Sequence, residues 1–302
     1  MTLANQIPAF DDAMVRHRFA ELDDVRLHYV EAGDGPVVVL LHGFPEFWYS
    51  WRFQFAPLVE AGYRVVAPDM RGYGRSDKPR GWRAYRVEAL AADIAQLVDA
   101  VGASEVTLVG HDWGGIVAWC TAMLHPSCVS RLSIANVPHP SHFASMALDP
   151  AQVRRSWYIA FLQLPWIAKR RFEADDFAYL STLFTRDTER EDAFTTADIE
   201  RYKEAFRDGA AESAMAYYRA LLRRPPSDYK KMLRPIEVPT QVIWGCKDRH
   251  IGLAYAEPPA KWVWDLRMDY LENASHWVQV DRPVAYNARL LSFIGEAPGA
   301  GV

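Results

Sequence analysis

Short, continuous runs of β-branched residues and leucine restrict this chain to few fold classes. Residues 37–41 read Val-Val-Val-Leu-Leu, and residues 63–67 and 106–109 have a similar character. Because apolar residues follow one another in these runs, they are typical of strands that are covered on both faces. Residues 87–101 and 116–124 instead repeat apolar side chains at helical spacing. Strands that alternate with helices predict βαβ units, and therefore an α/β fold with a mostly parallel central sheet and helices on both faces.

The same alternation of strands and helices continues elsewhere in the sequence. A helix is expected between the last two predicted strands, and another from about Val280. The further strands are predicted at residues 25–31, 129–137, 241–244 and 266–271.

Residues 139–230 interrupt this rhythm, because they show helical spacing without clear strands. One helix is expected to begin near Thr195, with Asp198 three residues further on as its capping partner. We predict that residues 139–230 form a helical lid, inserted into a core of residues 1–138 and 231–302. The alternative is a set of extra helices on the edge of the sheet.

Charge and composition exclude several classes of partner. The 302 residues include 34 Lys and Arg against 38 Asp and Glu, which gives a net charge of −4. No basic stripe stands out, so no nucleic-acid partner is expected. Residues 169–172, Lys-Arg-Arg-Phe, are interpreted as a solvated helix face rather than a binding patch.

Cysteine usage and the ends of the chain favour a reducing compartment. The three cysteines, Cys120, Cys128 and Cys246, show no paired spacing, which argues against a disulfide framework or a zinc site. The first residues have neither a basic region nor a long apolar stretch, and no apolar run reaches membrane-spanning length. We expect a cytoplasmic protein with no membrane partner, and a loose tail over residues 295–302.

The sharpest chemical signal is the hexapeptide Gly110-His-Asp-Trp-Gly-Gly115, which follows a predicted buried strand and opens an apolar helix. This context is that of a nucleophile elbow, a tight turn that needs small residues on both sides. The elbow carries Asp112, and the amide groups and dipole of a helix N-terminus keep a carboxylate ionised. An ionised carboxylate can attack an electrophilic carbon. The alternative is that Asp112 only caps the helix, but we favour the nucleophile.

A second turn, His42-Gly-Phe-Pro45, also follows a buried strand. Ligands of open α/β sheets bind beyond the carboxyl ends of the strands, where this turn and the elbow both lie. The backbone N–H groups of Phe44 and Trp113 could together stabilise a developing oxyanion. An ordinary βα turn is the alternative.

Two later residues complete a catalytic triad in chain order. Asp248 follows the predicted strand at 241–244, and His276 follows the strand at 266–271. The order nucleophile, acid, histidine is the one that sheets of this kind use. His276 is predicted to act as general base, and Asp248 to orient it and stabilise the imidazolium.

From about residue 25 to 295 the chain resembles the α/β-hydrolases, and within that superfamily the epoxide hydrolases. The resemblance rests on the two turns around Phe44 and Asp112, on the segment Asp69-Met-Arg-Gly-Tyr-Gly-Arg-Ser76, and on Asp248 and His276. It implies an α/β-hydrolase fold with a helical lid, and conversion of an epoxide to a vicinal diol through a covalent ester on Asp112. These motifs are shared with the haloalkane dehalogenases.

The resemblance also implies two lid tyrosines that donate to the epoxide oxygen. Tyr218 precedes an arginine as the second lid tyrosine of the family does, and Tyr158 lies in a similar context to the first. The sequence departs from the family pattern at Leu162, where phenylalanine is usual. Tyr217 is the rival of Tyr218, and Trp157 is the neighbour that could be confused with Tyr158.

We expect the substrate to be a small apolar epoxide, which reacts with water, and the protein to take part in detoxification. No cofactor or metal is expected, because the histidines and carboxylates lack metal-ligand spacing. A homodimer is possible by resemblance. His42, Pro45, Trp157 and Trp166 are predicted to line the substrate pocket.

Two other functions are considered. A haloalkane dehalogenase would use Asp112, Asp248 and His276 in the same way, with a halide as leaving group. A catalytically silent binding protein would keep the pocket without turnover, but all three triad positions are filled.

Overall fold

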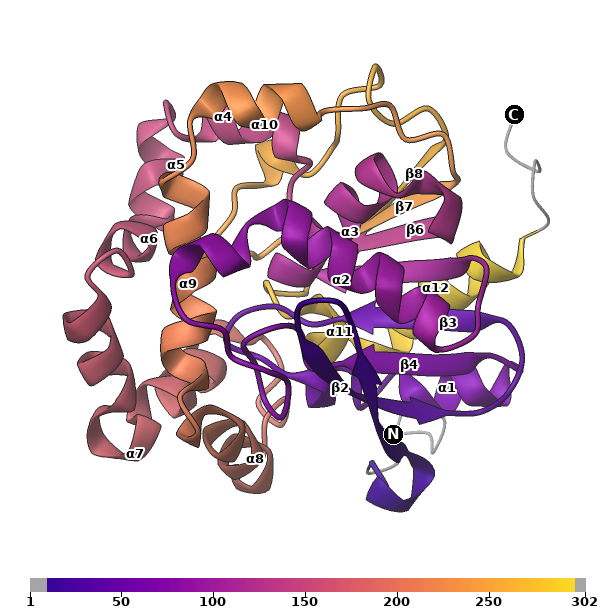
Figure 1. Cartoon of the computed structure of the whole chain (residues 1–302), viewed down its shortest axis with the longest axis horizontal. Helices are drawn as coiled ribbons and strands as arrows, with labels where there is room; N and C mark the ends of the chain where they lie inside the picture. The colour runs from indigo at the N-terminus through magenta and orange to yellow at the C-terminus, as the bar shows by residue number, and fades with distance from the viewer. Residues whose placement is uncertain (1–9, 297–302) are drawn as a thin grey trace.

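An eight-stranded sheet forms the centre of the molecule (Figure 1). The structure is a computed structural model that describes residues 10–296, so the N-terminal segment and the expected tail beyond Glu296 lie outside the described residues. The strand order is β1-β2-β4-β3-β5-β6-β7-β8. The strands are β1 (Arg16–Glu21), β2 (Arg26–Ala32), β3 (Val37–Leu41), β4 (Arg64–Pro68), β5 (Val106–His111), β6 (Val129–Ala135), β7 (Thr240–Gly245) and β8 (Leu266–Leu271).

The sheet is mostly parallel, as the sequence predicts. β1 and β2 pair antiparallel, and β2 pairs antiparallel with β4. Every other neighbouring pair is parallel. The apolar runs at β3, β4 and β5 are almost entirely buried, because helices cover both faces of the sheet there.

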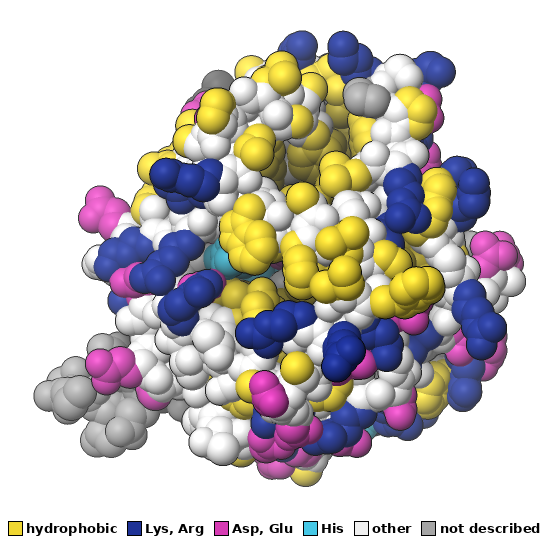
Figure 2. All heavy atoms as spheres, turned by 90° about the vertical axis from the view of Figure 1, so that its left-hand side faces the viewer, with side chains coloured by type: hydrophobic (Ala, Val, Ile, Leu, Met, Phe, Trp, Pro, Cys, Tyr) yellow, Lys and Arg dark blue, Asp and Glu magenta, His cyan; other side chains and the backbone are white. Residues whose placement is uncertain are grey.

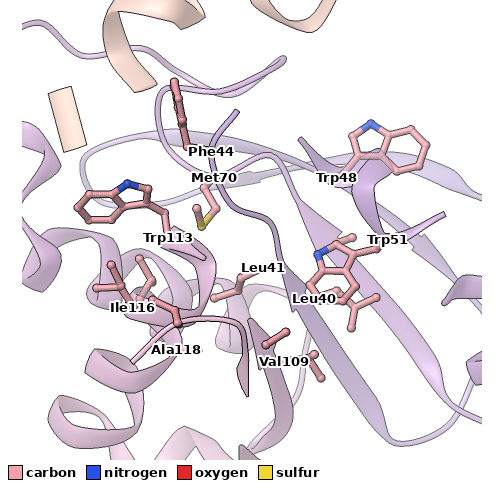
Figure 3. Close-up of a cluster of buried hydrophobic side chains, with 14 of the residues drawn as sticks. Leu40, Leu41, Phe44, Trp48, Trp51, Met70, Val109, Trp113, Ile116 and Ala118 are labelled. Atoms are coloured by element: carbon pink, nitrogen blue, oxygen red, sulfur yellow. The ribbon is translucent and has the colours of Figure 1, made fainter. Parts of the chain in front are cut away.

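Helices α2 and α3 lie on one face of the sheet, and α1, α11 and α12 lie on the other (Figure 1). Leu40 and Leu41 are consecutive in β3 and therefore point to opposite faces. Figure 3 shows Leu40 beside Trp51 and Leu41 on the side of Ile116 in α3. These helices are α1 (Phe55–Glu60), α2 (Val87–Ala100), α3 (Trp113–Leu124), α11 (Val278–Asp281) and α12 (Pro283–Gly295).

The predicted helical insertion is confirmed: between β6 and β7 the described residues hold helices and no strand. Figure 1 shows these helices grouped at one end of the sheet. Backbone angles are non-helical at Ala174–Phe177, which divides α7 into two parts. The inserted helices are α4 (Phe143–Met146), α5 (Pro150–Arg155), α6 (Trp157–Phe161), α7 (Pro165–Asp187), α8 (Thr196–Arg207), α9 (Ala210–Leu222) and α10 (Pro226–Met232).

The predicted start of α8 is also confirmed. Thr195 Oγ1 accepts the backbone N–H of Asp198 at 3.1 Å, and Asp198 Oδ2 accepts the backbone N–H of Thr195 at 2.8 Å. This reciprocal pair is a capping box, which satisfies two amide donors at the helix N-terminus.

One strand was not predicted, and one expectation about the helices was wrong. β1 was not predicted, because its sequence Arg-His-Arg-Phe-Ala-Glu is polar and lies at the exposed edge of the sheet. No helix of α type lies between β7 and β8 in the described chain; a loop with one short 3-10 turn, η7 (Leu253–Tyr255), takes its place. Pro258 and Pro259 follow that turn and prevent a regular helix.

Within residues 10–296, no helix combines the length and the apolar character that crossing a bilayer requires.

Candidate active site

Asp112 lies on a sharp turn between β5 and α3. Its backbone has φ 49° and ψ −121°, a combination that residues other than glycine rarely adopt. The turn can form because its neighbours are small: a Cβ on Gly110 would collide with the carbonyl of Gly114, and a Cβ on Gly114 with the carbonyl of Leu41. The turn places the Asp112 carboxylate at the carboxyl end of the sheet, as the elbow predicts.

We expect Gly114→Ala to lower the free energy of unfolding by about 3 kcal/mol, because the added methyl group would push α3 away from β3. Urea denaturation measures this loss. Gly295→Ala at the end of α12 is the matched control, since no atom lies within 4 Å of a Cβ there. Equal stability of the two variants would contradict the close approach of α3 to β3.

The turn after β3 contributes an amide donor to the carboxylate. Phe44 N–H donates to Asp112 Oδ1 at 2.8 Å. Trp113 is the first residue of α3, so its backbone N–H has no intrahelical acceptor. The Phe44 amide therefore contacts the Asp112 carboxylate, while the Trp113 amide, one residue further along the chain than Asp112, remains a predicted second donor to an oxyanion.

His42 has a different place from the one predicted. Its ring is fully buried, with Nε2 accepting the backbone N–H of Met70 at 3.0 Å and Nδ1 donating to the Gly43 carbonyl at 2.9 Å. Burial lowers the pKa of His42, which keeps the ring neutral. His42 does not line the pocket; it joins the ends of β3 and β4.

Asp248 and His276 come together with Asp112. His276 Nδ1 donates to Asp248 Oδ2 at 2.7 Å, and His276 Nε2 lies 3.6 Å from Asp112 Oδ2. Three further donors hold Asp248: the Asn136 side chain at 2.8 Å and the backbone N–H groups of His250 and Ile251 at 2.7 and 2.9 Å. The three residues thus form a carboxylate–imidazole–carboxylate row with its end at the elbow.

Charges on either side of His276 set its protonation. Burial lowers the pKa of His276, but the Asp248 and Asp112 carboxylates outweigh burial and raise it well above its ordinary value. Burial raises the pKa of Asp112, but the hydrogen bond and charge of His276 lower it overall. Asp112 is therefore ionised and paired with a protonated His276 in the free protein. Loss of the charge on Asp112 would release His276 to act as a base.

The Asp248 carboxylate makes the stability of the fold depend on pH in the acidic range. Burial raises the pKa of Asp248, but the charge and hydrogen bond of His276 outweigh burial and lower it to about 2. Because the folded-state pKa is below the unfolded one, the carboxylate stabilises the fold above pH of about 4, and this contribution is lost as the pH falls toward about 2. We expect a loss of about 2 kcal/mol over that range, measured by urea denaturation.

In Asp248→Asn this part of the acid dependence should disappear. Asp192→Asn, at a side chain that is 80% exposed, should keep it. An Asp248→Asn variant as sensitive to acid as the unchanged protein would contradict the assignment.

A pocket opens directly above Asp112, and the inserted helices provide one of its walls. Tyr158 of α6 and Tyr218 of α9 line it together with Phe44, Pro45 and His276. The rings of Tyr158 and Tyr218 meet edge to face, with centroids 5.9 Å apart. Burial first, and then the charge of Asp112, raise the pKa of both phenols well above the ordinary value, so both remain protonated donors.

Tyr217 is separated from this pocket. Its hydroxyl donates to the Arg71 carbonyl at 2.7 Å, and its ring packs against Tyr73 and Tyr85. Consecutive residues of α9 thus point in different directions, and only Tyr218 lines the pocket.

The two tryptophans predicted to line the pocket were placed wrongly. The side chain of Trp157 is 64% exposed and that of Trp166 is 85% exposed. Neither borders the pocket above Asp112. Each side chain lies on the outer side of its helix. Which side of a helix faces outward depends on how the insertion packs on the core.

Four pocket residues were missed: Tyr179, Leu183, His250 and Trp277. Trp277 follows the predicted base and His250 comes two residues after the predicted acid, so proximity in sequence was a usable signal for both. Tyr179 and Leu183 lie on α7, and no sequence motif indicates which face of α7 meets the core.

His250 connects the acid loop with the insertion. Its Nε2 lies 3.2 Å from Oδ2 of Asp187, the last residue of α7, and its ring packs edge to face against Tyr158 and His276. Burial raises the pKa of Asp187, but its close contacts with His250 and Arg186 outweigh burial and lower it. An ionised Asp187 therefore fixes the His250 ring in the pocket wall.

Within residues 10–296, no group of three or more His, Cys, Asp or Glu side chains is arranged to hold a metal ion. The titratable side chains that line the pocket include the carboxylate of Asp112, the imidazole of His276 and the phenols of Tyr158 and Tyr218.

Comparison with known proteins identifies the family to which the fold belongs. The family described as alpha/beta hydrolase fold matches residues 36–283. Epoxide hydrolase 4 of Homo sapiens is 37% identical over 297 residues, which cover 95% of this chain and 81% of that protein. AB hydrolase superfamily protein YfhM of Bacillus subtilis is 38% identical over 283 residues, 93% of this chain and 98% of that protein.

Solved structures give the same result. An epoxide hydrolase from Bacillus megaterium, in complex with an inhibitor, superposes with a TM-score of 0.84 at 28% identity; the match covers 92% of this chain and 100% of that one. Epoxide Hydrolase A from Mycobacterium thermoresistibile has a TM-score of 0.80 at 30% identity, over 93% and 98% of the two chains. The chain therefore belongs to the α/β-hydrolase superfamily and, within it, to the epoxide hydrolase family.

Proposed function

We propose that this protein hydrolyses an epoxide to a vicinal diol through an alkyl ester on Asp112. The observation that carries the proposal is the position of an elbow carboxylate in one pocket with two protonated phenols and an imidazole. A strained three-membered ether needs both a nucleophile at carbon and a proton donor at oxygen, and candidates for both line this pocket.

In the first step, an Asp112 oxygen forms a bond to one epoxide carbon while the bond between that carbon and the epoxide oxygen breaks. The oxygen takes a proton from Tyr158 or Tyr218. This step leaves a neutral alkyl ester on Asp112 and a phenolate. The phenolate then takes the proton of His276, which no longer faces a charged Asp112, so His276 becomes neutral. The lowered pKa of Asp112 supports its role, because the nucleophile must be ionised before the attack.

In the second step, His276 takes a proton from water, and the resulting hydroxide attacks the ester carbonyl. The N–H groups of Phe44 and Trp113 stabilise the oxyanion. The diol leaves as an alkoxide and takes the proton of the new Asp112 carboxyl group. Asp112 is then ionised beside a protonated His276, which restores the starting state.

The lining of the pocket supports an apolar epoxide. Phe44, Leu183 and Trp277 contribute apolar surface around the reacting groups. One related structure, a mutant of the Bacillus megaterium epoxide hydrolase, holds its product, a naphthyloxy-substituted propanediol. A vicinal diol with an aromatic substituent is the class of product that we propose here, and styrene oxide is a suitable first substrate.

A single turnover with excess enzyme in heavy-oxygen water tests the covalent route. We expect the diol of the first turnover to carry no label and the Asp112 peptide to acquire it, because the new diol oxygen comes from the carboxylate. Heavy oxygen in the first diol would show direct attack by water and overturn the proposal. Halide release from chloroalkanes or bromoalkanes, without diol formation from styrene oxide, would instead identify a haloalkane dehalogenase.

A further inference from the structure

The outer side of the insertion carries an unusual number of exposed apolar residues. Twelve large hydrophobic side chains are exposed among the described residues, and six of them lie within residues 148–167. Figure 2 looks onto this side of the molecule, where hydrophobic side chains gather among those of lysine and arginine. The six are Leu148, Val153, Trp157, Leu164, Trp166 and Ile167, and we call them the outer lid surface.

The chain segment that carries most of the outer lid surface contains basic residues but no acidic ones. Residues 150–172 contain five basic side chains and no Asp or Glu, although the whole chain has a net charge of −4. Lys169 pairs with Glu173, and Arg155 donates to the Asp248 carbonyl. The other three basic residues form no ion pair within residues 10–296: Arg154, Arg170 and Arg171.

We propose that the outer lid surface docks on a lipid bilayer that contains anionic headgroups. Tryptophan is suited to the membrane interface, because its ring is largely apolar and its N–H remains hydrated. Arginine and lysine beside it are attracted to the negative surface of an anionic leaflet. Exposed Trp and Ile side chains with unpaired arginines next to them combine both contributions on one short stretch of chain.

The charge of this surface argues against a second copy as its partner. A symmetric contact would bring the basic residues of two copies together, and within residues 150–172 there is no acidic side chain to compensate. Like charges at close range oppose association, whereas anionic lipids neutralise all of them. The proposal also replaces the interpretation of residues 169–172 as a merely solvated face and the expectation of no membrane partner.

The docked surface would lie next to the pocket. In α6, Trp157 points to solvent, while the next residue, Tyr158, lines the pocket above Asp112. An apolar epoxide dissolves better in a bilayer than in water, so docking would bring the pocket wall close to its source. This link rests on the proposed function, but bilayer binding itself does not and can fail or succeed separately.

Sedimentation with vesicles tests the docking without any measurement of activity. We expect the protein to sediment with vesicles of phosphatidylcholine and phosphatidylglycerol, more weakly as salt is added, and little with phosphatidylcholine alone. The double variant Trp157→Gln/Trp166→Gln should lower the partition coefficient at least about tenfold. Arg170→Gln/Arg171→Gln should lower it by a similar factor and reduce its dependence on salt.

Trp264→Gln is the matched control, because Trp264 is 60% exposed and lies outside the insertion, in the loop before β8. It should bind vesicles like the unchanged protein. Thermal unfolding of all variants should agree, since the replaced side chains are exposed. No binding to anionic vesicles, or equal loss in the control, would overturn the proposal. The proposal would also be overturned if sedimentation velocity showed a dimer that the double variant Trp157→Gln/Trp166→Gln converts to a monomer. That result would mean that a second copy of the chain covers the outer lid surface.

Discussion

His276→Gln is expected to stop the reaction after its first half, with the protein held as an alkyl ester. Glutamine cannot take a proton from water, so the ester on Asp112 would persist while the attack that forms it continues. We expect steady-state turnover to fall by about 10³–10⁴-fold. Intact mass spectrometry should show the protein heavier by the mass of one epoxide, and peptide mapping should place the addition on Asp112.

The charge arrangement makes this prediction specific. The protonated His276 is paired with Asp112 in the free protein. In the proposed mechanism it becomes a base only after the ester has removed the negative charge of Asp112. His125→Gln, the same chemical change at the end of α3 away from the pocket, should turn over normally. A His276→Gln variant that loses turnover without any mass increase would place His276 in the first step and contradict the proposed sequence of events.

Tyr158→Phe and Tyr218→Phe should each slow formation of the ester by about 10²-fold, and the double variant should show almost none. The reason is that both phenols line the pocket with Asp112 and remain protonated, so each removes part of the charge that develops on the epoxide oxygen. Rapid-quench measurement of the alkylated protein isolates this step from hydrolysis of the ester.

Tyr217→Phe is the matched control for the phenol assignment. It loses a hydrogen bond to the Arg71 carbonyl and should cost about 1 kcal/mol of stability, with ester formation unchanged. Ester formation at the original rate in the double Tyr158 and Tyr218 variant would mean that another group protonates the epoxide oxygen.

Much of the fold could be predicted because its strands carry strong local signals. The buried runs at β3, β4 and β5 have no polar face, so their burial on both sides follows from composition. β1 has no such run, because an edge strand with exposed side chains does not need one. The helix expected between β7 and β8 failed for a local reason, the prolines at 258 and 259.

In the candidate site, too, some residues could be predicted from local sequence and others could not. Asp112, Asp248 and His276 could be predicted because each follows a strand, and parallel strands bring their carboxyl ends to one edge. Tyr158 and Tyr218 entered only through resemblance to a family. Trp157 and Trp166 were assigned to the pocket wrongly, because adjacent helix residues differ by about 100° in direction and the sequence does not show which face meets the core.

The amino-acid sequence alone therefore predicted the α/β sheet, the elbow and the three candidate triad residues, since each prediction rests on a motif of a few neighbouring residues. Tertiary packing decided which lid side chains face Asp112: it turned Tyr218 inward and Tyr217 away, placed His250 against Asp187, and left Trp157 and Trp166 on the surface. The physical reason is that the inserted helices acquire an inside and an outside only by docking on the sheet, through contacts between residues far apart in the chain.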